Sequence, residues 1–166
     1  VKNFNKLTYL AIDNSEYTGE MPLLPKSIEQ FYGQNNQLTG TIISLSNFIN
    51  LNEIQLGNNN LTGTLPALNI PGLKAIHFEN NRLAGTVPPL PSALTDLHVD
   101  RNLLSGSLPS VKDITKCTLY SIIEAVPRDN CFEPLVSCGN CNCRERRIGF
   151  CITPKPTPKP TPKPTP

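Results

Sequence analysis

The chain has 166 residues, a formal net charge of +2 and only 17% charged residues, with 17 Pro and no Trp. This length fits one ordinary domain, and the near-neutral charge argues against a dedicated nucleic-acid-binding protein. The low charged fraction disfavours a coiled coil or a highly charged disordered chain. No apolar run approaches the roughly 18 residues of a membrane helix, so we expect no transmembrane segment in this sequence.

The first and last parts of the sequence differ in charge and in cysteine content. Residues 1–115 carry seven Lys/Arg and nine Asp/Glu, whereas residues 116–166 carry eight and four and hold all six cysteines. We therefore expect a repeat region over 1–127, a cysteine-rich cap over 128–152 and a stalk or linker over 153–166. The sequence begins at Val1 without a methionine or signal peptide, so we expect a mature chain or a fragment.

A repeat of 20–23 residues fills the first two-thirds of the chain. Five copies of L-x-x-L-x-L-x-x-N-x-L-x-G-x-L-P begin at residues 7, 28, 51, 73 and 94, and a partial sixth copy begins at 114. The alternating apolar residues predict a short strand with one buried face in each copy. One copy cannot bury that face alone, so stacking of the copies is expected to form a continuous core.

The recurring Asn and Gly of the repeat predict how the turns of neighbouring copies are held together. An Asn recurs just after each strand from the second copy onward, and a Gly recurs four residues after it, at Asn36, Asn59, Asn81, Asn102 and at Gly40, Gly63, Gly85, Gly106. A buried Asn can both donate and accept, so a column of them can bond the turn backbone of neighbouring copies. Departures include Ser15 in place of the first Asn and Gly33 at an inward position.

The repeat closely resembles the leucine-rich repeat in its plant-type subclass, over about residues 7–127. The resemblance implies an α/β-type but strand-rich, right-handed solenoid with a parallel β-sheet on its concave face. It also implies a second short strand around the L-x-G-x-L segment. Proteins of this type are extracellular or on the cell surface, so the resemblance implies the same location here.

The residues between the inward positions should point outward and form columns on the concave face. Strands about 4.8 Å apart place equivalent positions side by side. Exposed Tyr and His with hydrogen-bonding neighbours suit an interface, so we predict that this face binds a protein or glycan partner. The candidate partner-binding residues are Tyr9, Tyr32, Glu53, Gln55, His77, Glu79, Asp96, His98 and Asp100.

His77 and His98 could have a more specific function than contact with a partner. Beside Glu79, Asp96 and Asp100 they could ligate a metal or form a pH-sensitive pair. Two solvated surface histidines explain the pattern more simply, so we predict no metal and no cofactor. Nothing beyond residue types supports a catalytic Ser/His/Asp arrangement, so we expect no enzyme activity and no catalytic residue.

Covalent modification is predicted at the cysteines and at one asparagine. Cys117, Cys131, Cys138, Cys141, Cys143 and Cys151 are even in number and favour three disulfides, whose connectivity the sequence leaves open. The CGNCNC spacing leaves zinc as the alternative. Asn60 begins the sequon Asn60-Leu61-Thr62, is expected to face outward and is a candidate for N-glycosylation.

The last residues, 153–166, repeat Thr-Pro-Lys-Pro and favour an extended polyproline stalk. Repeats, cysteine module and stalk together resemble leucine-rich-repeat surface antigens of kinetoplastids, as well as plant extracellular proteins with Pro-rich extensions. The leading hypothesis is an extracellular or cell-surface recognition module. The alternatives are a non-catalytic coat or spacer protein, and an inhibitor of a secreted hydrolase similar to the polygalacturonase inhibitors.

Overall fold

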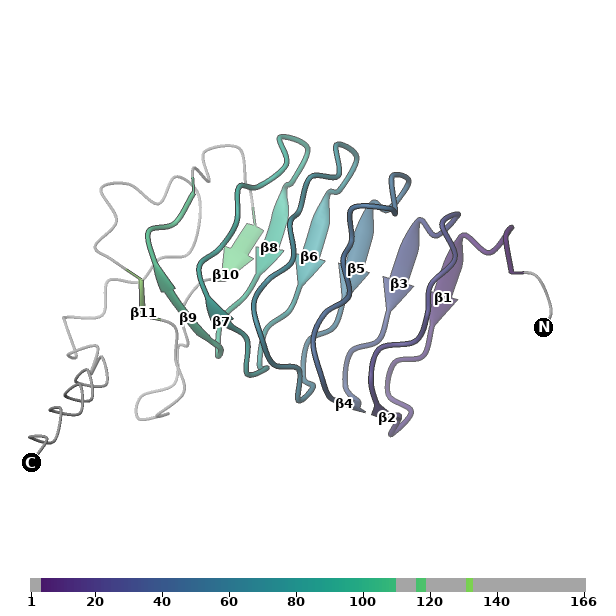
Figure 1. The fold of residues 1–166 in the computed structure, drawn as a ribbon, viewed down its shortest axis with the longest axis horizontal. Coiled ribbons are helices and arrows are strands. Elements are labelled where there is room, and N and C mark those ends of the chain that lie inside the picture. The colour runs from purple at the N-terminus through teal and green to yellow at the C-terminus, as the bar shows by residue number, and fades with distance from the viewer. Residues whose placement is uncertain (1–3, 110–115, 119–130, 133–166) are drawn as a thin grey trace, which may run out of the picture.

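A solenoid of stacked coils is the architecture of the chain in the computed structural model, which describes residues 4–109, 116–118 and 131–132 (Figure 1). Each coil contributes one three-residue strand to a six-stranded parallel sheet on the concave face. Its strands, in spatial order, are β1 (Tyr9–Ala11), β3 (Gln30–Tyr32), β5 (Glu53–Gln55), β6 (Ala75–His77), β8 (Asp96–His98) and β10 (Lys116–Thr118). Neighbours in the sheet are the strands of consecutive repeats, as the repeat pattern predicts.

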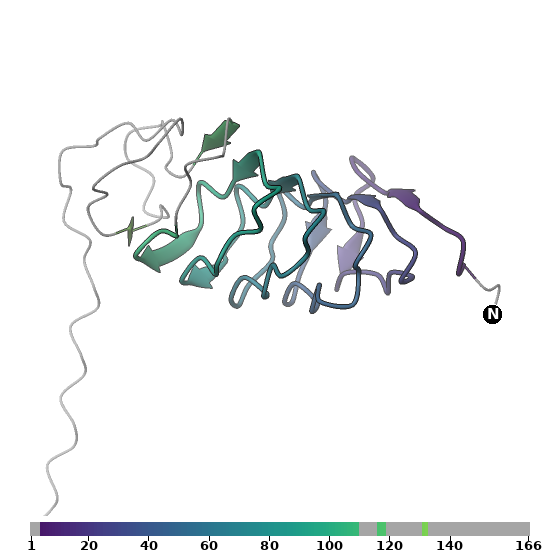
Figure 2. The ribbon, with the colours of Figure 1, turned by 90° about the horizontal axis from the view of Figure 1, so that it is seen from above.

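A second set of strands, two to four residues long, forms on the other side of the coils (Figure 2). They are β2 (Thr18–Gly19), β4 (Gln37–Leu38), β7 (Ala84–Gly85), β9 (Leu103–Gly106) and β11 (Cys131–Phe132). β2 pairs with β4, β9 pairs with both β7 and β11, and the isolated bridges Thr41–Thr62 and Thr64–Ala84 lie between the two groups. The predicted second strand therefore forms near the recurring Gly. Among the described residues the coils consist of strands and turns without a helix.

The core runs the length of the stack and is made of the repeat's inward positions. The inward strand residues Ile54, Ile76 and Leu97 are at most 1% exposed. Their counterpart in the first coil, Leu10, is half-buried and packs on the edge of the core, because it has a described coil on one side only. Burial thus increases from the first coil to the interior of the stack, as expected for a solenoid.

Gly33 departs from the repeat, and the structure gives the reason. Phe31 is fully buried at the preceding inward position, and its ring fills the space that a side chain at position 33 would occupy. A Cβ on Gly33 would lie 3.1 Å from Phe31 Cζ and 3.2 Å from Leu56 Cδ2. The large Phe and the absent side chain therefore compensate for each other within one coil.

The predicted asparagine column is present and links successive coils. Asn59 Oδ1 accepts a hydrogen bond from the Leu38 backbone N–H at 2.9 Å, and Asn59 Nδ2 donates to the Gly33 carbonyl at 2.9 Å. Asn36, Asn81 and Asn102 make equivalent pairs of contacts to the preceding coil. Since Asn81 and Asn102 are buried, these side chains replace water as partners for turn backbone groups.

The predicted boundary between solenoid and cap falls where few residues are described. β11 lies within the 128–152 segment and pairs in parallel with β9, with Cys131 opposite Ser105. The second-side sheet therefore takes its last described strand from the predicted cap. The stalk at 153–166 and the rest of the cap lie outside the described residues. No helix of membrane-spanning length and apolarity occurs in the described part of the chain.

Candidate functional site

The concave face carries three columns of outward-pointing residues, set by the register of the sheet. The first is Tyr9, Gln30, Glu53, Ala75 and Asp96, and the second is Ala11, Tyr32, Gln55, His77 and His98. The backbones of Lys116 and Thr118 in β10 continue the register of these two columns. Backbone hydrogen bonds beyond the strands continue the register into a third column of Asp13, Gln34, Gly57, Glu79 and Asp100. The alternation of apolar and polar residues predicts the same columns.

The described side chains of these columns give the face an acidic character. Five of them are carboxylates and none is Lys or Arg; the carboxylates are Asp13, Glu53, Glu79, Asp96 and Asp100. All five are partly shielded from solvent, as the polar side chains of adjacent strands pack against each other. A surface of this charge attracts basic partners.

An aromatic and amide cluster occupies the part of the face near β1, β3 and β5. The rings of Tyr9 and Tyr32 are tilted with centroids 5.4 Å apart. Burial and a hydrogen bond with Glu53 raise the pKa of Tyr32 to about 12. Gln55 Nε2 donates to Glu53 Oε1 at 2.6 Å, and Gln30 Nε2 lies 3.5 Å from Glu53 Oε2. Glu53 therefore orders the polar side chains around it.

A histidine and aspartate cluster occupies the part of the face over β6 and β8. His77 lies directly opposite His98 in the register, and their rings meet edge-on with centroids 4.5 Å apart. Asp96 Oδ1 lies 2.8 Å from His98 Nε2 and 3.4 Å from His77 Nε2. Asp96 and His98 share one face because they are two residues apart on a strand. The sequence placed these three residues near one another, and the structure shows that their polar atoms converge.

Glu79 behaves differently from the acidic residues of the first column. Its carboxylate folds over the backbone of Gly57. A Cβ atom added at position 57 would collide with this carboxylate. Glu79 Oε2 and Gln34 Oε1 are buried on either side of Gly57 without a hydrogen-bond partner. The absent side chain at Gly57 thus makes room for Glu79 and keeps it away from the histidines.

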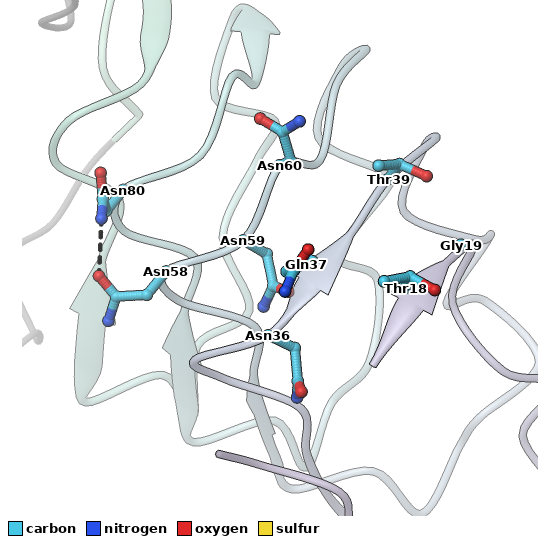
Figure 3. Close-up of a pocket in the computed structure, with 9 residues that line it drawn as sticks. All are labelled: Thr18, Gly19, Asn36, Gln37, Thr39, Asn58, Asn59, Asn60 and Asn80. Carbon is cyan, nitrogen blue, oxygen red and sulfur yellow. Dashed lines mark hydrogen bonds between the residues drawn. The ribbon is translucent and has the colours of Figure 1, made fainter. Parts of the chain in front are cut away.

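A shallow polar depression lies beside the asparagine column (Figure 3). It has a volume of about 510 Å³ and is lined by Thr18, Gly19, Asn36, Gln37, Thr39, Asn58, Asn59, Asn60 and Asn80. Asn80 Nδ2 donates to Asn58 Oδ1 at 2.7 Å across its wall. Asn60 belongs to this lining and is half-buried. Its glycosylation stays a prediction.

A second asparagine column, which sequence reasoning missed, borders this depression. Asn14, Asn35, Asn58 and Asn80 all have φ between +52° and +55°, and Arg101 takes the same place at +51°. Asn tolerates this left-handed conformation better than other non-glycine residues. The sequence contains a signal for this column, because an Asn-Asn pair recurs at 35–36, 58–59 and 80–81.

The predicted disulfide residues are described only in part. The backbones of Cys117 and Cys131 lie in β10 and β11, whereas Cys138, Cys141, Cys143 and Cys151 lie outside the described residues. Their pairing and the zinc alternative stay predictions. The partner-binding role of the concave-face residues also stays a prediction, although their placement on one surface is a structural finding.

Comparison with known proteins gives similar folds in plant receptors. The leucine-rich-repeat ectodomain of the Arabidopsis thaliana membrane receptor kinase GASSHO1/SCHENGEN3, in complex with CASPARIAN STRIP INTEGRITY FACTOR 2, is 27% identical with a TM-score of 0.62. The Arabidopsis receptor kinase HAESA, in complex with the peptide hormone IDA and the co-receptor SERK1, is 24% identical with a TM-score of 0.65. Pollen Receptor Kinase 3 is 25% identical with a TM-score of 0.57.

This chain has the leucine-rich-repeat fold. The matches cover 77%, 76% and 72% of it, but only 16%, 22% and 61% of the three receptor chains. It therefore spans less than two-thirds of each of these receptors. No protein-family model matches the chain, and no curated protein sequence matches it. The resemblance to kinetoplastid antigens stays a prediction.

Proposed function

We propose that the chain is a non-catalytic extracellular recognition module that binds a basic, extended peptide segment of a protein on its concave face. The observation that carries this proposal is the shared surface of aromatic, amide and carboxylate side chains in three columns. Similar folds, in the receptors GASSHO1/SCHENGEN3 and HAESA, were solved in complex with a peptide hormone or an integrity factor. The GASSHO1/SCHENGEN3 structure is that of a receptor ectodomain, which supports an extracellular location for this chain.

The dimensions of the face agree with a short peptide. Six strands about 4.8 Å apart span roughly 24 Å, which is the length of about seven extended residues. The Tyr9 and Tyr32 rings offer an apolar contact at one end, and the carboxylates Glu53 and Asp96 offer charge-assisted hydrogen bonds further along. A peptide with one aromatic or aliphatic residue and several Lys or Arg residues complements this order.

The proposal is tested with a displayed library of random heptapeptides selected on the immobilised full chain. We expect enrichment of Lys- and Arg-containing sequences and saturable binding of the selected peptides by calorimetry. Tyr32→Ala and Glu53→Gln should each weaken that binding at least about fivefold, as for interface anchors. Tyr17→Ala and Glu20→Gln are the matched controls, because these exposed residues belong to the opposite side of the first coil.

Other outcomes of the same test would contradict the proposal. Equal losses in the test and control variants would show binding away from the concave face. Selection without any saturable peptide would favour a coat or spacer protein, and binding to an oligosaccharide array in its place would favour a glycan ligand. Lowered activity of a polygalacturonase upon addition of the chain would favour a hydrolase inhibitor.

A further inference from the structure

We propose that His77, Asp96 and His98 form a binding site for a divalent transition-metal ion on the concave face. Two imidazoles and one carboxylate are the ligand set that zinc, copper, nickel and iron accept. The three side chains each offer one ligand atom, and these atoms all lie within 4.8 Å of one another. In the described part of the chain this is the one cluster of metal-ligating side chains with that convergence.

The distances agree with coordination of one ion. Two metal–ligand bonds of about 2.1 Å that meet at 90–110° hold their ligand atoms about 3.0–3.4 Å apart. Asp96 Oδ1 is 3.4 Å from His77 Nε2 and 2.8 Å from His98 Nε2. The 2.8 Å distance is slightly shorter than this range, and the separation between the two imidazole nitrogens is at most 4.8 Å. Small rotations of these side chains would bring both separations into the range.

The hydrogen bonding of the cluster is incomplete without an ion. His77 Nε2 is buried and has no hydrogen-bond partner in the described part of the chain. A buried nitrogen without a partner is unfavourable, whereas a bound cation would accept its lone pair. The same cation would contact Asp96 Oδ1, which lies between the two imidazole nitrogens.

The sheet holds the ligands in place at the surface of the concave face. β6 and β8 are adjacent strands (Figure 1), and their register places Ala75 opposite Asp96 and His77 opposite His98. The side chains of His77, Asp96 and His98 are 23%, 21% and 30% exposed, so the cluster lies at the surface, although His77 Nε2 and Asp96 Oδ1 themselves are buried. Three protein ligands would leave the fourth position of a tetrahedral ion open. Metal binding here does not depend on the proposed peptide ligand.

The inference departs from the expectation of two independent surface histidines. That expectation followed from residue types alone. In the structure the Glu79 carboxylate lies over Gly57, whereas Asp96 Oδ1 lies close to both imidazole Nε2 atoms. The two readings differ in a measurable way. A cluster of the same three side chains without metal affinity would leave both imidazoles insensitive to added cations.

The test is a Zn²⁺ titration of the full chain followed by imidazole nitrogen NMR. The sequence contains only two histidines, and both belong to the cluster, so their signals are unambiguous. We expect both imidazoles to shift in a saturable manner with one equivalent of Zn²⁺, and not with the same concentration of Mg²⁺, which prefers oxygen ligands. Zinc held by the cysteines alone would leave the imidazole signals in place and overturn the inference.

Variants separate the site from general attraction of cations. Asp96→Asn should raise the dissociation constant for Zn²⁺ at least about tenfold. His77→Gln should abolish the saturable shift of His98. Glu79→Gln is the matched control, because it removes a carboxylate from the same face outside the cluster and should leave Zn²⁺ binding unchanged. Equal weakening by Glu79→Gln and Asp96→Asn would overturn the inference, and circular dichroism verifies the folding of each variant.

Discussion

The Asn81 side chain accepts a 3.0 Å hydrogen bond from the backbone N–H of Leu61, twenty residues earlier in the chain. Asn81 Nδ2 also donates to the Leu56 carbonyl at 2.9 Å. One buried side chain therefore satisfies a donor and an acceptor of the preceding coil, as well as carbonyls of its own turn. Such contacts couple neighbouring coils and favour cooperative unfolding of the solenoid.

Asn81→Ala should strongly destabilise the chain. The substitution leaves the buried Leu61 N–H without its side-chain partner, at about 1–3 kcal/mol for an unsatisfied buried group. The Leu56 carbonyl loses one of two bonds, because Asn59 Nδ2 still donates to it at 3.1 Å. We expect the free energy of unfolding to fall by roughly 1–3 kcal/mol in chemical denaturation. Asn80→Gly is the control, since it removes an exposed hydrogen bond and tolerates positive φ. A comparable loss in both variants would contradict the role of the buried column.

Arg101→Asn should stabilise the chain. Arg101 has φ of +51° at a position where the preceding four coils have Asn. A left-handed conformation costs a non-glycine residue roughly 1–2 kcal/mol, and Asn lowers that cost. We expect an increase of about 0.5–1 kcal/mol in the free energy of unfolding. Arg82→Asn, an exposed Arg without positive φ, should change it by less than about 0.5 kcal/mol.

Gly33→Ala and Phe31→Leu should be coupled. Ala at position 33 crowds Phe31 Cζ and Leu56 Cδ2, and such overpacking costs about 1–3 kcal/mol. Phe31→Leu removes the part of the ring that the new methyl group meets. We therefore expect the double variant to lose less free energy of unfolding than the two single variants together, by about 0.5 kcal/mol or more. Additive losses in a double-mutant cycle would show that the two positions do not compensate.

Tyr32 should ionise at higher pH than an ordinary phenol. Burial and the hydrogen bond with Glu53 raise its pKa to about 12 in the folded state, against 10.0 for the unperturbed group. The folded state therefore binds the proton more tightly. The resulting stability is fully present below pH 10 and is lost as the pH rises toward 12.

An ultraviolet titration of the tyrosines tests this assignment. Tyr32→Phe should remove the component of the absorbance change with the highest pKa. Glu53→Gln should lower the pKa of Tyr32 toward 10, because it removes the negative charge and changes the hydrogen bond beside the phenol. An unchanged titration in Tyr32→Phe would show that another tyrosine is responsible for the high value.

The repeat period and the alternation of apolar residues determined much of this protein in advance. Because a strand has a period of two, the spacing of residues such as Ile54, Ile76 and Leu97 identified the inward side of every coil. The same alternation predicted the outward columns that contain Tyr32 and His98. The recurring Asn also predicted the buried column, since its hydrogen-bonding capacity matches the needs of a turn.

Only the tertiary structure decided how side chains on those columns associate. Whether Asp96 or Glu79 meets the histidines depends on rotamers, on the space above Gly57 and on neighbours about twenty residues away. The same holds for the pairing of Phe31 with Gly33 and for the half-buried Asn60. A repeat pattern specifies where each backbone position lies. The contacts between coils, which set rotamer and solvation, then determine which polar atoms converge.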